Sequence, residues 1–202
     1  MLTLSFLLLV VVFRSVVLPA LGVALNLLSA GAAYGLLVWV FQYGHGAGLL
    51  GFQQVDTIES WLPLFLFSVL FGLSMDYQVF LLSRIQERYG HTGDNRDAVA
   101  FGLRTTGGII TGAAVIMVAV FAGFAAGRLV MLQQMGFGLA VAVLIDATLV
   151  RSVLVPAAMR LLGRWNWYLP SWLGWLPQVR IEGAAAPAPT PAEPEREPQP
   201  VR

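Results

Sequence analysis

The sequence predicts an all-α integral membrane protein built as a polytopic helical bundle. Of its 202 residues, 57% are hydrophobic and only 11% are charged, and the mean hydropathy is +0.74. Several apolar stretches reach or exceed the ~20 residues that a helix needs to cross a bilayer. Most of the charge lies between these stretches or in the C-terminal tail. This composition places the chain in the membrane class.

Four full spans and one partial span are expected within residues 1–164. The partial span, at about residues 2–13, is twelve residues long and is followed by Arg14, so it is too short to cross a bilayer. The full spans are expected at about residues 16–42, 62–82, 105–127 and 129–156. A secretory signal peptide is the weaker interpretation of the first segment, because it lacks a basic n-region and continues into another apolar stretch.

Polar and small residues inside the spans predict how the helices contact one another. Pro19 falls near the start of the first full span, where a missing N–H costs least. Asn26 and Ser29 follow in the same span and are expected to form hydrogen bonds across helices. The third full span contains Gly108-Ile-Ile-Thr-Gly112 and Gly123-Phe-Ala-Ala-Gly127. Small residues four apart favour close approach of helix backbones, so helix packing is the favoured interpretation of both motifs.

The distribution of charge predicts the orientation in the membrane. The loop between the first two full spans carries Asp56 and Glu59 but no arginine, and it is assigned to the external side. The opposite side collects most of the arginines: Arg14, Arg84, Arg88, Arg96, Arg104, Arg151, Arg160 and Arg164, against Arg128 on the external side. Because positive charge is retained in the cytoplasm, we expect a cell-membrane protein with a cytoplasmic C-terminus.

The C-terminal part of the chain is not expected to span the membrane. Residues 165–182 are rich in tryptophan and are interrupted by Pro170, a composition typical of a segment that lies along the headgroup region. Residues 183–202 are rich in proline, alanine and glutamate and have almost nothing to bury. We expect them to form a disordered tail.

Composition also argues against several functional classes. The chain has no cysteine, and His45 and His91 lie in separate loops without metal-ligand spacing, so neither a metal site nor a metalloenzyme is expected. The net charge is only +1, and no basic patch points to nucleic acid. No cofactor is expected, and membrane lipids are the natural surroundings of the chain.

Asp76 and Tyr77 are the most informative residues of the sequence. They lie inside the apolar run of residues 61–82, where a charged side chain costs a few kcal/mol or more. Asp76 precedes Arg84 by eight residues, or ~12 Å of helix, which places it well inside the hydrocarbon. Low polarity disfavours the charged form of a carboxyl group, which suits a group that gains and loses protons. We therefore expect Asp76 and Tyr77 to handle protons rather than only to pin two helices together.

A second acidic residue, Asp146, lies in the fourth full span, five residues before Arg151. Five residues is a poor spacing for two side chains on one face of an α-helix, so an ion pair between them is not expected. Relay support and helix packing stay open as roles for Asp146. Thr106 and Thr111 are further candidates for satisfying a buried carboxyl group, although hydroxyls in spans also bond to their own helix.

These motifs resemble the mycobacterial membrane protein large (MMPL) family of the resistance-nodulation-division (RND) superfamily. The similarity is carried by Phe71-Gly-Leu-Ser-Met-Asp-Tyr-Gln-Val-Phe-Leu-Leu-Ser-Arg-Ile-Gln-Glu87, by Arg104-Thr-Thr-Gly-Gly-Ile-Ile-Thr-Gly112 and by residues 138–157. It covers about residues 1–180. The resemblance implies a bundle like the last spans of a proton-driven exporter of lipids or other hydrophobic molecules, with Asp76 and Tyr77 as one proton-relay pair.

Family members are expected to have twelve spans in two related halves, with an Asp-Tyr pair in each half and two external porter domains. This chain has one such pair and no porter domain. We therefore expect the C-terminal transmembrane portion of an exporter, incomplete alone and needing a complementary N-terminal half or self-association. The transported molecule is not assigned by the sequence.

Two other classes remain as alternatives. A non-transporting assembly partner, or a degenerate remnant of a transporter, is the stronger of them. An intramembrane aspartyl protease also uses two aspartates in adjacent spans. Neither Asp76 nor Asp146 has the Gly-x-Gly-Asp context of such enzymes, so enzymatic activity is not expected.

Overall fold

Four helices of the computed structural model are long and apolar enough to cross a membrane, which confirms the predicted fold class. The structure describes residues 2–46, 48 and 51–168. Within them the elements are α1 (Leu2–Phe13), α2 (Val17–Phe41), α4 (Leu62–Thr92), α5 (Asn95–Ala125), α6 (Val130–Ile145), the π-helix η1 (Asp146–Leu154), α7 (Val155–Leu162) and the 3-10 helix η2 (Gly163–Trp167).

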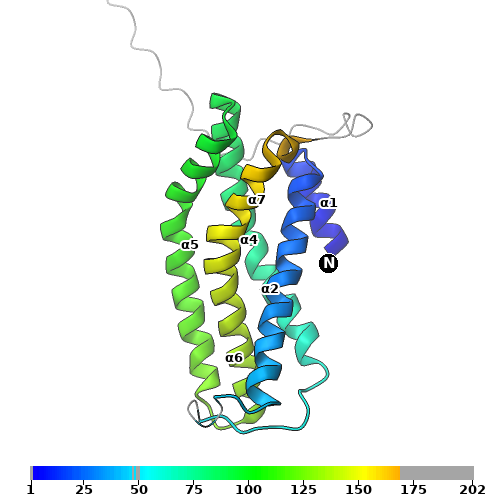
Figure 1. Cartoon of the computed structure of the whole chain (residues 1–202), viewed down its shortest axis with the longest axis vertical. Coiled ribbons are helices and arrows are strands. Elements are labelled where there is room, and N and C mark those ends of the chain that lie inside the picture. Colours follow the sequence, from blue (N-terminus) through cyan, green and yellow to red (C-terminus); the bar gives the residue numbers. More distant parts are fainter. Residues whose placement is uncertain (1, 47, 49–50, 169–202) are drawn as a thin grey trace, which may run out of the picture.

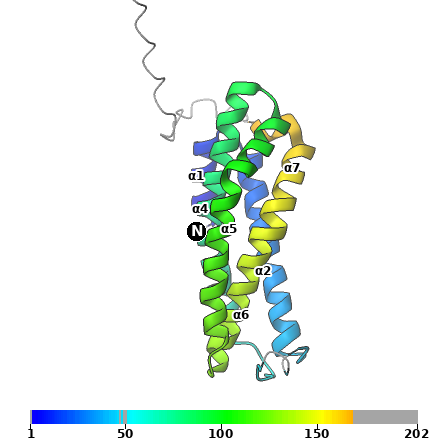
Figure 2. The ribbon, with the colours of Figure 1, turned by 90° about the vertical axis from the view of Figure 1, so that its left-hand side faces the viewer.

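The long helices lie side by side along the long axis of the molecule (Figures 1 and 2). α6, η1 and α7 follow one another without a break and together form the fourth candidate span, Val130–Leu162. The connections from α2 to α4 and from α5 to α6 lie at one end of the bundle. The turns after α1 and after α4, together with η2, lie at the other end (Figure 1). By the predicted orientation, the second end is the cytoplasmic one.

Two apolar clusters hold the bundle together near its two ends. At the end that carries η2, buried residues from five elements pack against one another: Leu9, Phe13, Leu18, Leu81, Leu82, Ile85, Ala98, Val99, Ile110 and Met159. The cluster at the opposite end contains Leu37, Val40, Phe41, Leu62, Leu66 and Leu139. Along α4 the buried residues Leu62, Leu66 and Leu70 recur every four positions, which is the spacing of one helical face.

α4 and α5 continue beyond the spans expected from hydropathy and form a helical hairpin. α4 ends at Gly93, which adopts a left-handed conformation with φ 66° that glycine tolerates. Asp94 then caps α5, because its carboxylate accepts hydrogen bonds from the backbone N–H groups of Arg96 and Asp97. Arg88 donates from Nε to the Asp97 carboxylate at 2.7 Å and so joins the two arms.

The segment after α7 is packed onto the bundle through Asn166, which is fully buried. Ser15 donates from its hydroxyl to the Asn166 carbonyl oxygen at 2.6 Å. The Asn166 amide donates to the Met159 carbonyl oxygen at 2.6 Å. Tyr89 and Trp167 stack with their ring centroids 4.7 Å apart. The rest of the expected interfacial segment, residues 169–182, and the expected tail, residues 183–202, lie outside the described residues.

Two helix backbones approach each other closely at Gly136, a glycine outside both predicted packing motifs. A Cβ on Gly136 of α6 would lie 2.5 Å from the carbonyl oxygen of Phe121 on α5. By contrast, a Cβ at Gly108, Gly112 or Gly123 would meet no atom of another described helix within 4 Å. The expectation that these glycines pack helices is therefore wrong within the described bundle, because they face away from the neighbouring helices.

This difference between the glycines predicts opposite effects of adding one methyl group. Gly136→Ala is expected to lower the free energy of unfolding by about 1–3 kcal/mol, since the methyl group would force two backbones apart. The matched variant Gly123→Ala, on the neighbouring helix with open space, is expected to be neutral or stabilising by up to about 1 kcal/mol. Denaturant unfolding of the purified protein in mixed micelles would measure both. Equal destabilisation by the two variants would contradict the packing described here.

Candidate functional site

The fourth span changes from α-helix to π-helix at the position of its acidic residue. η1 runs from Asp146 to Leu154, and the Val155 N–H bonds to the carbonyl of Val150, five residues earlier. Pro156 follows at once. A proline has no N–H and clashes with the carbonyl four residues before it, so the α-helical pattern is interrupted here. π-Helices are rare and often occur at functional sites.

The wider helix brings Asp146 and Arg151 together. Arg151 donates from Nη2 to the Asp146 carboxylate at 2.9 Å, and both residues are only 5% exposed. In an α-helix, residues five apart are separated by about 140° around the axis. The expectation that they would not pair is therefore wrong, because the wider π-helix, with its i→i+5 hydrogen bonds, turns less per residue and brings side chains five positions apart closer to one face.

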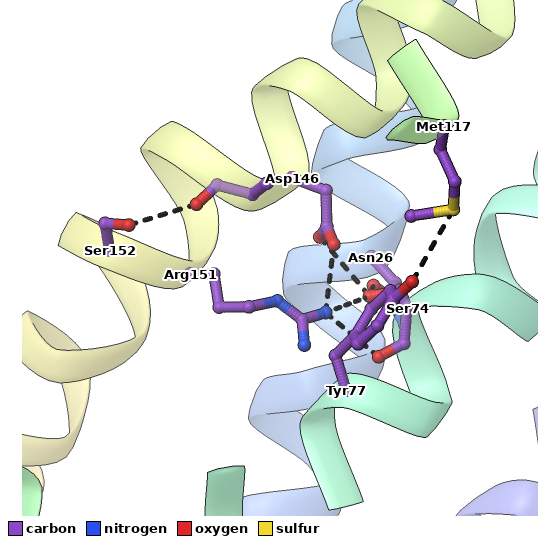
Figure 3. Close-up of polar contacts among 8 residues, drawn as sticks. Asn26, Ser74, Tyr77, Met117, Asp146, Arg151 and Ser152 are labelled. Carbon is purple, nitrogen blue, oxygen red and sulfur yellow. Dashed lines mark hydrogen bonds and ion pairs between the residues drawn. The ribbon is translucent and has the colours of Figure 1, made fainter. Parts of the chain in front are cut away.

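Ser74 of α4 lies against the ion pair and connects it to α2 (Figure 3). Its hydroxyl lies 2.6 Å from Asn26 Oδ1 and 3.3 Å from Asp146 Oδ1. Arg151 Nη2 donates to both the hydroxyl and the backbone carbonyl of Ser74 at 2.9 Å. The contact between Ser74 and Asn26 confirms that Asn26 bonds across helices. Ser29 is buried, but its hydroxyl has no hydrogen-bond partner among the described atoms.

Tyr77 reaches the same region from the next turn of α4. The Arg151 guanidinium carbon lies 5.3 Å from the centroid of the Tyr77 ring, within the range of a cation–π contact. The Tyr77 hydroxyl donates to the sulfur of Met117 on α5 at 3.5 Å. These contacts define the Asp146 cluster, which consists of Asn26, Ser74, Tyr77, Met117, Asp146 and Arg151 (Figure 3).

Asp76 does not belong to this cluster, although it is adjacent to Tyr77 in sequence. It is exposed on the surface of α4, on the side away from the buried residues Ser74 and Gln78. Gly72 and Phe80, four residues before and after it, are also exposed. Asp76 therefore lies on the outer face of a membrane-spanning helix, where it meets either lipid or another chain segment.

The two threonines considered for relay support do not reach the aspartates. Thr106 is buried, but its hydroxyl donates to the carbonyl of Gly102 on its own helix at 2.8 Å. Thr111 is exposed on α5. In the described part of the chain, no hydrogen bond joins either hydroxyl to Asp76 or Asp146. The hydroxyl that contacts the buried carboxyl group belongs to Ser74 and not to either threonine.

Arg151 also has a different place from the one assigned by charge distribution. It was counted with the cytoplasmic arginines, whereas the structure buries it inside the bundle. Arg151 lies eleven residues before the end of α7, which is ~16 Å of helix. This distance from the helix end could have predicted that Arg151 lies inside the membrane and not at its surface. Within the described residues no group of three or more potential metal ligands occurs.

The comparison with known proteins decides the family of this chain. Residues 1–189 match the sequence model of the MMPL family. The chain belongs to the MMPL family. This assignment confirms the resemblance inferred from the helix that carries Asp76 and Tyr77.

The MMPL relatives are named as uptake or export proteins, and the four apolar helices make this chain a multi-pass membrane protein. It is 51% identical over 179 residues to the heme uptake protein MmpL11 of Mycobacterium tuberculosis. It is 49% identical over 179 residues to the mycolic acid-containing lipids exporter MmpL11 of Mycolicibacterium smegmatis. With the trehalose monomycolate exporter MmpL3 of the latter organism it shares 41% identity over 161 residues.

These alignments cover most of this chain but only a small share of each relative. They include 88% of the chain and 18% of the Mycobacterium tuberculosis protein. For the two Mycolicibacterium smegmatis proteins, 88% and 80% of the chain align with 19% and 16% of the relative. The chain therefore spans about a fifth of the length of the relatives it matches.

Proposed function

We propose that this MMPL chain is the C-terminal transmembrane portion of an exporter driven by the proton-motive force. Its cargo is a lipid or another hydrophobic molecule, and it has no enzymatic activity of its own. The buried Asp146 cluster carries this proposal, because an ion pair inside a membrane span is costly and commonly marks a proton pathway. The names of two lipid exporters among the relatives support the class of cargo.

Protonation of Asp146 would change the forces that hold α4 against η1. The carboxylate currently balances the Arg151 guanidinium, and both groups contact Ser74. A proton on Asp146 leaves the guanidinium without its counter-charge in a medium of low polarity. Arg151 would then depend on the Ser74 carbonyl and the Tyr77 ring, so the packing between these helices would become sensitive to proton occupancy.

The position of Asp76 supports a second part of the proposal, that the chain works with a companion. A carboxyl group on the outer face of a spanning helix costs about 2.5–3.5 kcal/mol if it faces lipid. Covering α4 with another helix would remove Asp76 from lipid and supply hydrogen-bond partners. We propose that a complementary N-terminal half covers this face, with a second copy of the chain as the alternative occupant.

The same proposal includes the orientation and the location. The chain lies in the cell membrane with its C-terminus in the cytoplasm, as the arginines of the α4–α5 hairpin and of α7 support. Asp76 and Tyr77 form one relay pair on α4, and Asp146 links proton occupancy to the arrangement of the helices.

Reconstitution in vesicles with an imposed proton gradient tests this function. The chain would be expressed alone and together with the product of the reading frame immediately upstream, and transport of a fluorescent lipid would be measured. We expect transport only with both products, and Asp76→Asn should reduce it to background because the amide cannot carry a proton. The matched variant Glu87→Gln changes an exposed carboxyl group on the same helix and should retain transport.

Two results would contradict the proposal. Transport by Asp76→Asn at the wild-type rate would remove Asp76 from the relay. Absence of transport in every combination would favour the alternative, a non-transporting assembly partner.

A further inference from the structure

We propose that one water molecule binds inside the membrane between α2, α4 and η1, held by Asn26 and Arg151. We further propose that this water extends the Asp146 cluster toward the cytoplasmic end. The binding site stands on the structure alone, whereas the role in a proton path rests on the proposed function.

The first observation is a small cavity beside the ion pair, which we call the α2 cavity. Its polar lining comes from Asn26, Ser74, Gln78, Asp146 and Arg151, and Gly22 forms part of its wall. It admits a water-sized sphere, about the space that one bound water needs. A polar cavity of this size with two to four hydrogen-bonding groups is typical of a buried water site.

The second observation is that two nitrogen atoms of the lining residues lack a protein partner. Asn26 is 3% exposed and Arg151 is 5% exposed, yet Asn26 Nδ2 and Arg151 Nη1 have no hydrogen-bond acceptor among the described residues. The second terminal nitrogen of Arg151 points away from Ser74 and Asp146 in Figure 3. A buried donor left without an acceptor costs about 1–3 kcal/mol, so both atoms favour an additional ligand.

The chemistry of the lining favours water over an ion. An anion would lie beside the Asp146 carboxylate, and a cation would lie beside the Arg151 guanidinium. Water is neutral and both donates and accepts hydrogen bonds. If the Asn26 amide is turned over, its Nδ2 donates to Ser74 and its oxygen is left without a protein donor. Water satisfies Asn26 in either orientation, because it bonds to a donor or to an acceptor.

The location of the α2 cavity gives this water its role. Ser74 contacts both Asp146 and Asn26, so the hydroxyl links the carboxylate to the residue that holds the water. Gln78 lies one helical turn beyond Ser74 in the direction of the α4–α5 hairpin, and it lines the same cavity. The water would therefore extend the hydrogen-bonded path from Asp146 toward the cytoplasmic end of α4.

A structure of the full chain in lipid, at a resolution that shows ordered water, tests the site. We expect density within about 3 Å of both Arg151 Nη1 and the Asn26 amide. It should persist in Ser29→Ala, which alters a buried hydroxyl one turn along α2, and disappear in Asn26→Leu. A cavity closed by protein atoms, with Arg151 Nη1 bonded to a protein oxygen, would overturn the proposal.

A second variant keeps the test decisive if Asn26→Leu does not fold. A Cβ on Gly22 would lie 2.7 Å from the amide carbon of Gln78, so Gly22→Ala should displace this side chain and remove the water. Because Gly22 is part of the cavity wall, the added methyl group would also take up space in a cavity that admits one water. Density that persists beside Arg151 Nη1 in a folded Gly22→Ala protein would therefore lie outside the α2 cavity and would overturn the site.

The transport assay separates the site from its role. Asn26→Leu should slow proton-driven lipid transport at least tenfold, while Ser29→Ala should leave it unchanged. Water density together with normal transport by Asn26→Leu would overturn the role in the proton path. A wild-type protein that binds the water but transports nothing in any combination would contradict the proposed function and support the water site.

Discussion

Arg151→Met is expected to lower the free energy of unfolding by about 3–5 kcal/mol, the usual cost of removing one partner of a buried ion pair. The substitution leaves the Asp146 carboxylate without its counter-charge at a site where the residue is 5% exposed. It also removes the two hydrogen bonds that Arg151 donates to Ser74. Unfolding in mixed micelles, followed by circular dichroism, measures the change.

The double variant Asp146→Leu with Arg151→Met separates the ion pair from the packing around it. Because both charges are removed together, we expect it to recover most of the lost stability. Arg160→Met is the matched control, since Arg160 is exposed on α7 in the same span, and it should change stability by no more than about 0.5 kcal/mol. A double variant as unstable as Arg151→Met would show that packing, rather than the unpaired charge, accounts for the loss.

Asn166→Ala is expected to lower the free energy of unfolding by about 1–3 kcal/mol, because it removes a fully buried amide that bonds within the bundle. The Asn166 amide donates to the Met159 carbonyl at 2.6 Å and to the Asn95 side chain at 3.3 Å. Loss of these bonds should loosen η2, whose neighbour Tyr168 accepts a hydrogen bond from the Val16 N–H at the start of α2. Hydrogen exchange should therefore become faster in the first turn of α2.

The control for this prediction is Trp165→Ala, because Trp165 lies in the same 3-10 helix but is 65% exposed. It should leave hydrogen exchange at the start of α2 close to the wild-type rate. Exchange should also be unchanged near Phe41, at the opposite end of α2. Uniformly faster exchange along α2 in Asn166→Ala would indicate global destabilisation and would contradict a local role for η2.

Local sequence was sufficient for the fold class because hydropathy is summed along a short stretch of chain. A run of about 20 apolar residues reports a membrane span whichever way its side chains face. The same local signal made Asp76 and Tyr77 conspicuous, since an acidic residue in such a run is costly. The motif around these two residues also identified the family, which the match over residues 1–189 confirms.

Hydropathy and local motifs could not predict which residues form the Asp146 cluster. The pairing of Asp146 with Arg151 depends on a π-helix, and the assumption of an α-helical period placed the two side chains on different faces. Ser74 and Thr106 are both hydroxyl residues within apolar spans. Only the arrangement of the helices shows that Ser74 reaches the ion pair and that Thr106 bonds to its own helix.

The sequence by itself therefore determined that this is an all-α membrane protein of the MMPL family with an acidic residue deep in a span. The tertiary structure decided that, of the two aspartates within the spans, Asp146 is buried and Asp76 faces outward. The physical reason is that the cost of burying a charge can be read from one helix. Which groups satisfy that charge depends on the local change to a π-helix, which pairs Asp146 with Arg151, and on helix packing, which brings Ser74 to Arg151 from 77 residues away.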